Sequence, residues 1–125
     1  MIKNILLVGL GGGIGSIARY GCQKWFAENI SSPFPWGTLA VNLIGCFLIG
    51  LIFAAAERSD LLTPATRLLL IAGICGGFTT FSAFAFENMQ LLRSGDVLYL
   101  LLYSAGSLVL GVAAVFAGIA VIKLF

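Results

Sequence analysis

The chain has 125 residues, of which 60% are hydrophobic and only 10% are charged, and it contains no histidine. Soluble domains carry about 25% charged residues, so a soluble globular domain is excluded and an integral membrane protein is predicted. A net charge of +2 is too small to indicate a nucleic-acid partner. The three cysteines have no metal-ligand spacing and are interpreted as small packing residues.

Charged residues divide the chain into four apolar segments. The first segment is interrupted by Arg19 and Lys24. Its beginning resembles a signal peptide, but no clear cleavage site follows, so we expect a helix that is retained in the protein. No charge occurs in residues 29–56, 68–86 or 97–122, and each run is close to or above the about 20 residues that a membrane helix needs. The sequence therefore predicts an all-α membrane protein, a single unit over 1–125, with four transmembrane helices at roughly 4–26, 37–56, 66–92 and 97–123.

Short polar segments connect these predicted helices. In the second connection, Thr63 is suited to cap the third helix and Pro64 to begin it. The sequence contains no extramembrane domain, so the function is expected within or across the bilayer.

Positive charges are almost equally divided between the two ends of the predicted bundle. An even number of spans places both termini on one side, and the two groups are Lys3, Arg58, Arg67 and Lys123 against Arg19, Lys24 and Arg93. A clear surplus normally fixes the orientation of a membrane protein, and here it is nearly absent. We therefore expect dual topology, with two copies meeting in opposite directions as an antiparallel homodimer. The alternative is that the small bias is sufficient for a single orientation.

The first span carries glycines at the spacing of close helix packing. Gly9 and Gly13 are four residues apart, as are Gly11 and Gly15, and this spacing lets helix backbones approach each other. Arg19 follows on the same helix, where it either reaches the membrane interface or supplies a fixed positive charge near a vestibule.

Polar residues in the second and fourth spans form stripes at helical spacing. Thr38, Asn42 and Gly45 share one face. Asn42 either bonds across a helix interface or contacts a polar permeant, as polar groups in membranes often do. The stripe on the fourth span, which is either a polar track or a packing seam, consists of Tyr103, Ser107 and Gly111.

A break is predicted in the third span, where Gly76, Gly77, Thr79 and Thr80 are poor helix formers. Broken membrane helices are tolerated only where the freed backbone groups are buried in protein or line a cavity. Unwound carbonyls there suit a hard cation such as Na⁺. The alternative is a kinked helix whose hydroxyls bond back to the preceding turn.

Phe81 and Phe84 share a helical face directly after this break. Aromatic residues at such spacing usually belong to a packed core. Their ring edges are electropositive, however, so they also suit a small anion that has lost part of its water.

Taken together, these residues resemble the small fluoride channel family (Fluc, also called CrcB) over essentially the whole chain. The resemblance rests on Gly13-x-Gly15 with Arg19, on Gly37-Thr-Leu-Ala-Val-Asn42-Leu-Ile-Gly45, and above all on Gly73-x-x-Gly76-Gly-Phe-Thr79-Thr-Phe81-Ser-x-Phe84-x-x-Glu87. It implies a dual-topology antiparallel homodimer in the bacterial inner (plasma) membrane that exports toxic cytoplasmic fluoride by passive conduction. It also implies two pores per dimer and a structural sodium ion at the dimer centre.

The same resemblance implies a role for individual residues. Phe81, Phe84 and Asn42 are expected to line the pore, with Thr38 nearby, and the backbone carbonyls of Gly76 and Thr79 to bind the sodium ion. Tyr103 and Ser107 are expected in the polar track. Glu87 is expected at a pore end and Arg19 near a vestibule. Gly111 departs from the pattern, because some members have a hydroxyl there.

Three other functional classes are less well supported. An enzyme is not expected, because no catalytic base, nucleophile or metal cluster is apparent. A proton-coupled small multidrug exporter has a similar length, four helices and often dual topology, but it needs a membrane-embedded carboxylate, typically in the first helix, and none lies in residues 1–27. A non-transporting scaffold would use the glycine seams, but it offers no account of the break.

Overall fold

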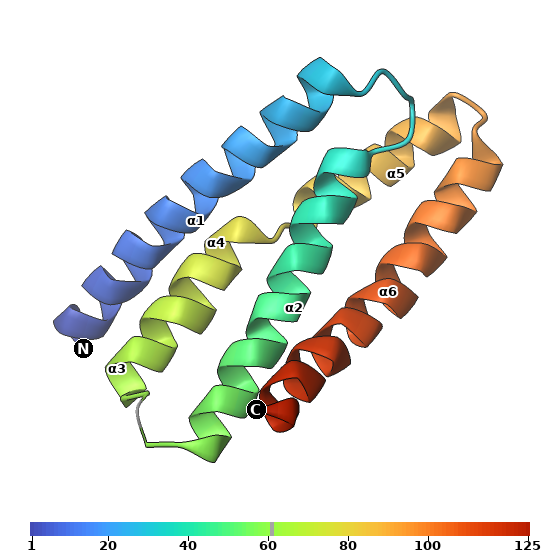
Figure 1. Ribbon diagram of the computed structural model, residues 1–125. Coiled ribbons are helices and arrows are strands. Elements are labelled where there is room, and N and C mark those ends of the chain that lie inside the picture. Colours follow the sequence, from blue (N-terminus) through green and yellow to red (C-terminus); the bar gives the residue numbers. More distant parts are fainter. Residues whose placement is uncertain (61) are drawn as a thin grey trace.

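The computed structural model describes residues 1–60 and 62–125, and its two termini lie at the same end of a helical bundle (Figure 1). Three continuous helices are α1 (Ile2–Asn29), α2 (Trp36–Arg58) and α6 (Val97–Leu124). The third span consists of α3 (Pro64–Arg67), the π-helical segment η1 (Leu68–Cys75), α4 (Gly76–Phe78) and α5 (Ser82–Arg93). Four stretches in the described residues are long and apolar enough to cross a membrane: Ile2–Asn29, Trp36–Arg58, Pro64–Arg93 and Val97–Leu124. The prediction of an all-α protein with four membrane-spanning helices is therefore confirmed.

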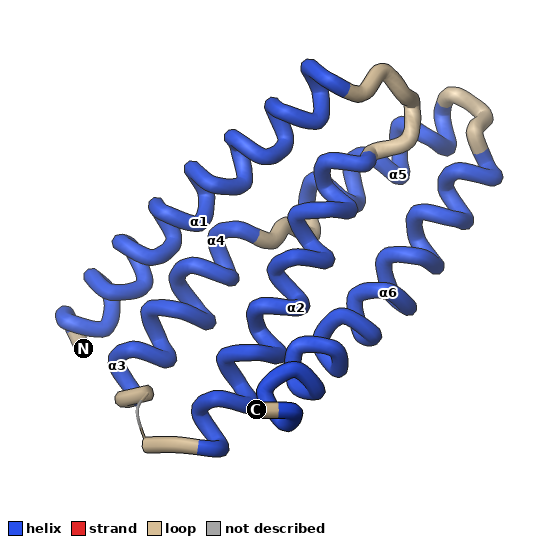
Figure 2. Tube along the Cα trace, in the orientation of Figure 1, coloured by secondary structure: helices blue, strands red, loops and turns tan. Residues whose placement is uncertain are grey.

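The third span changes neighbours along its length. η1 and α4 pack against α1, whereas α5 packs against α6. Figure 1 shows α3 and α4 on one side of α2 and α5 beyond it, so the span passes behind α2. The crossing coincides with the non-helical segment between α4 and α5, which is tan in Figure 2.

The start of the third span follows from two adjacent residues. The Thr63 hydroxyl accepts a hydrogen bond from the Thr66 N–H at 3.2 Å, and Pro64 occupies the first helical position. Proline is suited to this position because the first helical N–H has no intrahelical partner. The predicted cap is confirmed.

Glycines allow α1 to lie directly against the third span. A Cβ on Gly11 would lie 2.8 Å from Cα of Gly73, and one on Gly15 would lie 2.8 Å from the backbone nitrogen of Phe78. Both distances are too short for a real side chain, so glycine is required for this approach. Gly9 and Gly13 face open space, and only one of the two predicted glycine pairs packs within the subunit.

Little apolar surface is buried inside the subunit. In the described part of the chain, the largest fully buried side chains are Tyr103, Val41 and Cys75. Large apolar residues such as Ile17, Leu108 and Phe116 lie mostly exposed. Exposed apolar faces of this extent are typical of a protein that is covered by lipid or by another copy.

Candidate functional site

A side chain of α2 holds the backbone at the interruption of the third span. Thr79 is extended, with φ −83° and ψ 157°, and the helix resumes at Ser82. Asn42 binds Thr80 in both directions: its Nδ2 donates to the Thr80 carbonyl at 3.0 Å, and its Oδ1 accepts from the Thr80 N–H at 2.8 Å. Asn42 therefore makes a contact between spans, and one of its two amide N–H groups remains for another partner.

Gly45 makes room for the interruption on the same face of α2. The space that a side chain at Gly45 would occupy is filled by Cγ2 of Thr79. The Thr79 hydroxyl donates to the Cys75 carbonyl at 2.9 Å, which is the return bond to the preceding turn that threonine makes in helices. Since Asn42 and Gly45 are three residues apart, a single stripe of α2 shapes the interruption.

Several of the predicted pore residues surround one open hollow of about 550 Å³, here called the inner hollow. It lies between α2, the interruption and α6, and its lining includes Asn42, Thr79, Phe81, Phe84 and Ser107, together with Gly76. The Ser107 hydroxyl oxygen is buried and has no hydrogen-bond partner in the described residues. A buried hydroxyl without a partner costs free energy, so this oxygen is available to a polar species that enters.

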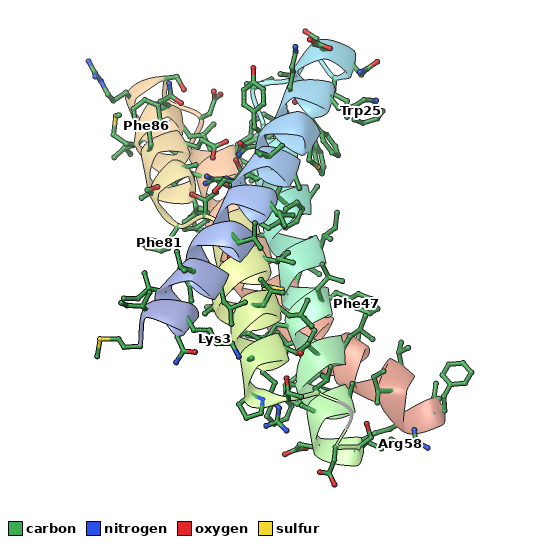
Figure 3. The ribbon with its side chains drawn as sticks, turned by 90° about the vertical axis from the view of Figure 1, so that its left-hand side faces the viewer. Lys3, Trp25, Phe47, Arg58, Phe81 and Phe86 are labelled. Carbon is green, nitrogen blue, oxygen red and sulfur yellow. The ribbon has the colours of Figure 1, made fainter. Side chains whose placement is uncertain are left out.

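Three aromatic rings form a row from the surface into the interior. The ring centroids of Phe81 and Phe84 are 5.7 Å apart, and those of Phe84 and Tyr103 are 4.9 Å apart. Phe81 is 77% exposed, where α5 begins (Figure 3), and Tyr103 is fully buried. The two phenylalanines therefore lie together, and one of them faces outward from the subunit.

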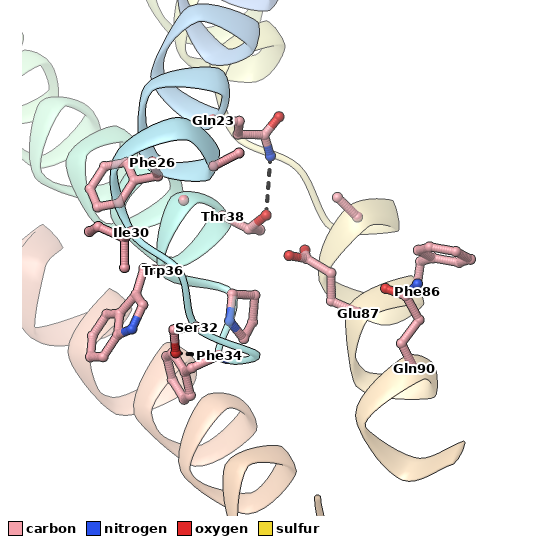
Figure 4. A pocket seen from close by; sticks show the side chains of 14 residues that line it. Gln23, Phe26, Ile30, Ser32, Phe34, Trp36, Thr38, Phe86, Glu87 and Gln90 are labelled. Carbon is pink, nitrogen blue, oxygen red and sulfur yellow. Dashed lines mark hydrogen bonds between the residues drawn. The ribbon is translucent and has the colours of Figure 1, made fainter. Parts of the chain in front are cut away.

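Thr38 and Glu87 line a second hollow, whose lining does not include Asn42. This outer hollow, of about 410 Å³, is lined by the end of α1, the connection to α2 and α5. Gln23 donates from Nε2 to the Thr38 hydroxyl at 3.1 Å. Figure 4 shows Glu87 extending from α5 toward Thr38, so three spans contribute polar groups here.

Tyr103 connects the two hollows. Its hydroxyl donates to Oε1 of Glu87 at 3.4 Å, and its ring contacts that of Phe84. Glu87 lines the outer hollow and Phe84 the inner one. The predicted site is thus divided in two, with a buried tyrosine between the parts.

Two of the predicted residues lie apart from both hollows. Arg19 is half-buried on α1 and lines neither the inner nor the outer hollow. Gly111 is buried, and a Cβ at this position would meet Sγ of Cys46 at 3.6 Å. This part of the α6 stripe therefore packs against α2.

Three polar residues near the hollows were not predicted from the sequence: Gln23, Asn88 and Ser104. The Ser104 hydroxyl donates to Oδ1 of Asn88 at 3.0 Å, and Nδ2 of Asn88 donates to the Phe84 carbonyl at 3.0 Å. This pair ties α5 to α6 one turn beyond Phe84. The available signal was the position of Asn88, four residues after Phe84, which places both on one helical face.

The interruption leaves backbone carbonyls without their helical donors. In an α-helix the Thr80 N–H would donate to the Gly76 carbonyl, but here it donates to Asn42. The Ala83 N–H, which would donate to the Thr79 carbonyl, donates to the Thr80 hydroxyl at 3.3 Å. The described residues contain no group of three or more His, Cys, Asp or Glu that could hold a metal ion. The freed carbonyl oxygens are ligands of the kind that hard cations take.

The chain is similar over nearly its whole length to proteins of one known family. A family model described as CrcB-like protein, Camphor Resistance (CrcB), matches residues 6–119. The chain is 47% identical over 123 residues to the "Fluoride-specific ion channel FluC" of Leptospira interrogans, covering 98% of this chain and 97% of the relative. It is 51% identical over 116 residues to the protein of that name in Chlorobium chlorochromatii, a match that covers 93% of this chain and 89% of the relative. It is 49% identical over 125 residues to the protein of that name in Chlorobaculum tepidum, a match that covers 100% of this chain and 98% of the relative. The chain is a multi-pass membrane protein that belongs to the CrcB-like family.

Proposed function

We propose that the chain is the subunit of a fluoride-selective passive ion channel that exports cytoplasmic fluoride and thereby lowers its toxicity. Relatives named "Fluoride-specific ion channel FluC" match nearly the whole chain. The observation that carries the proposal is the inner hollow, because it gathers an amide, a hydroxyl without a partner and two phenyl rings in one place. No step of chemical catalysis is involved.

Fluoride is small and holds its water tightly, so a pore must replace that water with fixed donors. The remaining N–H of Asn42 and the hydroxyl of Ser107 supply conventional donors. Phe81 and Phe84 supply electropositive ring edges. These groups are held by packed helices, so they need little rearrangement when the ion arrives. The narrow bore that we propose excludes chloride by size.

The outer hollow forms one end of the proposed route. Thr38 and Glu87 line it, and the buried Tyr103 leads from the Glu87 carboxylate to the ring of Phe84. Arg19 lines neither hollow of the subunit, so its proposed vestibule role requires the surface of a second copy.

The proposed assembly is a dual-topology antiparallel homodimer with two pores. It would place the interruption of the third span near the bilayer midplane. The outward position of Phe81, which is 77% exposed, supports an arrangement in which a second copy completes the pore. The almost equal division of positive charge between the two ends supports insertion in both directions.

The freed carbonyls fit the structural sodium ion of this proposal. The Gly76 and Thr79 carbonyls of both copies would hold it, since neither receives its helical N–H donor. When bound, the ion would offset the repulsion between these oxygens where two interrupted helices meet.

A proton-coupled multidrug exporter is the alternative from another class. Such an exporter needs a carboxylate in the first span, and α1 has none before Glu28 at its end. The names of the relatives and the composition of the inner hollow both favour the channel.

Substitution of Phe81 tests the proposed pore. Phe81→Ile removes a ring edge, and we expect fluoride efflux from liposomes to fall at least about tenfold, which corresponds to ~1.4 kcal/mol. The matched control is Phe116→Ile, because Phe116 is also exposed but lies on α6 outside both hollows. Equal efflux from both variants in folded dimers would remove Phe81 from the pore.

A further inference from the structure

We propose that Asn42 positions the cation site: by capturing the Thr80 N–H, it keeps the Gly76 carbonyl free to bind sodium. This inference rests on the proposed function, from which it takes the sodium ion. It gives Asn42 a second role beside that of a pore donor, and it couples the anion pore to the cation site through one side chain.

The hydrogen bonds on either side of the interruption locate this role. The Thr79 N–H still donates to the Cys75 carbonyl at 3.0 Å, four residues back, as in a helix. The next N–H, that of Thr80, is the first to leave this pattern, and it is the one that Oδ1 of Asn42 accepts at 2.8 Å. Asn42 therefore acts at the residue where the helix stops.

The contact is well protected and uses both backbone groups of Thr80. Thr80 is 8% exposed, so water competes poorly for its N–H. Nδ2 of Asn42 also donates to the Thr80 carbonyl, so the peptide groups on both sides of Thr80 are bonded to this side chain. The amide of Asn42 thus replaces the helical partners that Thr80 lacks.

Without the Asn42 oxygen, the buried Thr80 N–H needs another acceptor. In the continuing helix that acceptor is the Gly76 carbonyl, which belongs to the proposed sodium site. A sodium ion would then compete with a hydrogen bond for the same oxygen. Removal of the side chain should therefore weaken sodium binding even though Asn42 does not itself contact the ion.

Two substitutions separate this role from direct contact with fluoride. Asn42→Ala removes the oxygen that captures the Thr80 N–H. Asn42→Asp keeps an oxygen at that position but offers no amide N–H to an anion and adds a negative charge. Both should stop fluoride passage, but only the alanine variant should disturb the sodium site.

Sodium binding is measured as the rise in the thermal unfolding temperature of the purified, detergent-solubilised dimer as NaCl replaces N-methylglucamine chloride. We expect Asn42→Ala to weaken the apparent sodium affinity at least about tenfold, because a buried hydrogen bond now competes for the ligand. Asn42→Asp should stay within about threefold of the wild type. The control Cys22→Ala, on α1 and outside both hollows, should also leave the sodium response unchanged.

Several outcomes would overturn the inference. The first is an unchanged sodium affinity in Asn42→Ala, and the second is an equal loss in Asn42→Asp. Hydrogen exchange of the wild type gives a further test that does not depend on a variant folding, since the Thr80 amide should exchange as slowly as the helical amides around it. Fast exchange at Thr80 would refute the capture. A wild type that conducts fluoride without any response to sodium would remove the cation site itself, whereas a wild type that binds sodium without conducting fluoride would refute only the proposed channel.

Discussion

Gly45→Ala is expected to disturb the interruption of the third span without changing any polar group. The new methyl group would enter the space that Cγ2 of Thr79 occupies. Thr79 can avoid it by rotating about χ1, but this breaks the bond from its hydroxyl to the Cys75 carbonyl, which is worth about 1 kcal/mol. Otherwise α2 must move away, and overpacking of this kind costs about 1–3 kcal/mol.

The matched control is Gly9→Ala, because Gly9 lies on α1 with open space around it. Alanine there is expected to stabilise the helix by up to about 1 kcal/mol. The free energies of unfolding of the two variants, measured by SDS titration, should therefore differ by about 1–4 kcal/mol. Fluoride efflux should fall in Gly45→Ala alone, since a displaced Thr79 distorts the wall of the inner hollow. Equal stability and equal efflux in the two variants would refute the account of Gly45.

Three further substitutions test other contacts of the site and the bundle. Asn88→Ala removes the bond that joins α5 to α6 and a second bond, within α5, to the Phe84 carbonyl, and we expect a severalfold loss of fluoride efflux, with Asn4→Ala on α1 as the control. Arg58→Gln removes the hydrogen bonds from the guanidinium group to the backbone oxygens of Ile122 and Phe125 and should lower the free energy of unfolding by about 1 kcal/mol. Lys3→Gln is the control, and an effect of Arg58→Gln no larger than that of the control would contradict this prediction. Gln23→Ala removes the hydrogen-bond donor to the Thr38 hydroxyl and should slow fluoride efflux while leaving the preference for fluoride over chloride unchanged. A changed preference would place Gln23 in the selective part of the pore.

The sequence was sufficient for the features that depend on local chemistry. Charge-free runs locate the second, third and fourth spans, because a charged side chain inside a bilayer is costly. Thr63 and Pro64 mark the start of the third span, since capping depends on adjacent residues. The glycine and threonine run lies where α4 ends and α5 begins.

Contacts that depend on the register between spans could not be predicted from the local sequence. Thr38 and Asn42 share a face of α2, but Thr38 contacts Gln23 and Asn42 contacts Thr80. Which partner each residue meets is decided by how α1 and the crossing third span pack against α2. The hydrogen bond between Asn88 and Ser104 has the same origin, because their spans meet only after the third span has crossed behind α2.

The central claim is that this protein conducts fluoride selectively, and efflux from liposomes tests it most directly. Purified wild-type protein is reconstituted in vesicles loaded with fluoride or with chloride, and the released ion is followed with the matching electrode. We expect rapid loss of fluoride with negligible loss of chloride, because the fixed donors of a narrow bore replace the water of the smaller ion. Well-folded protein that releases no fluoride, or that releases both ions at similar rates, would contradict this expectation.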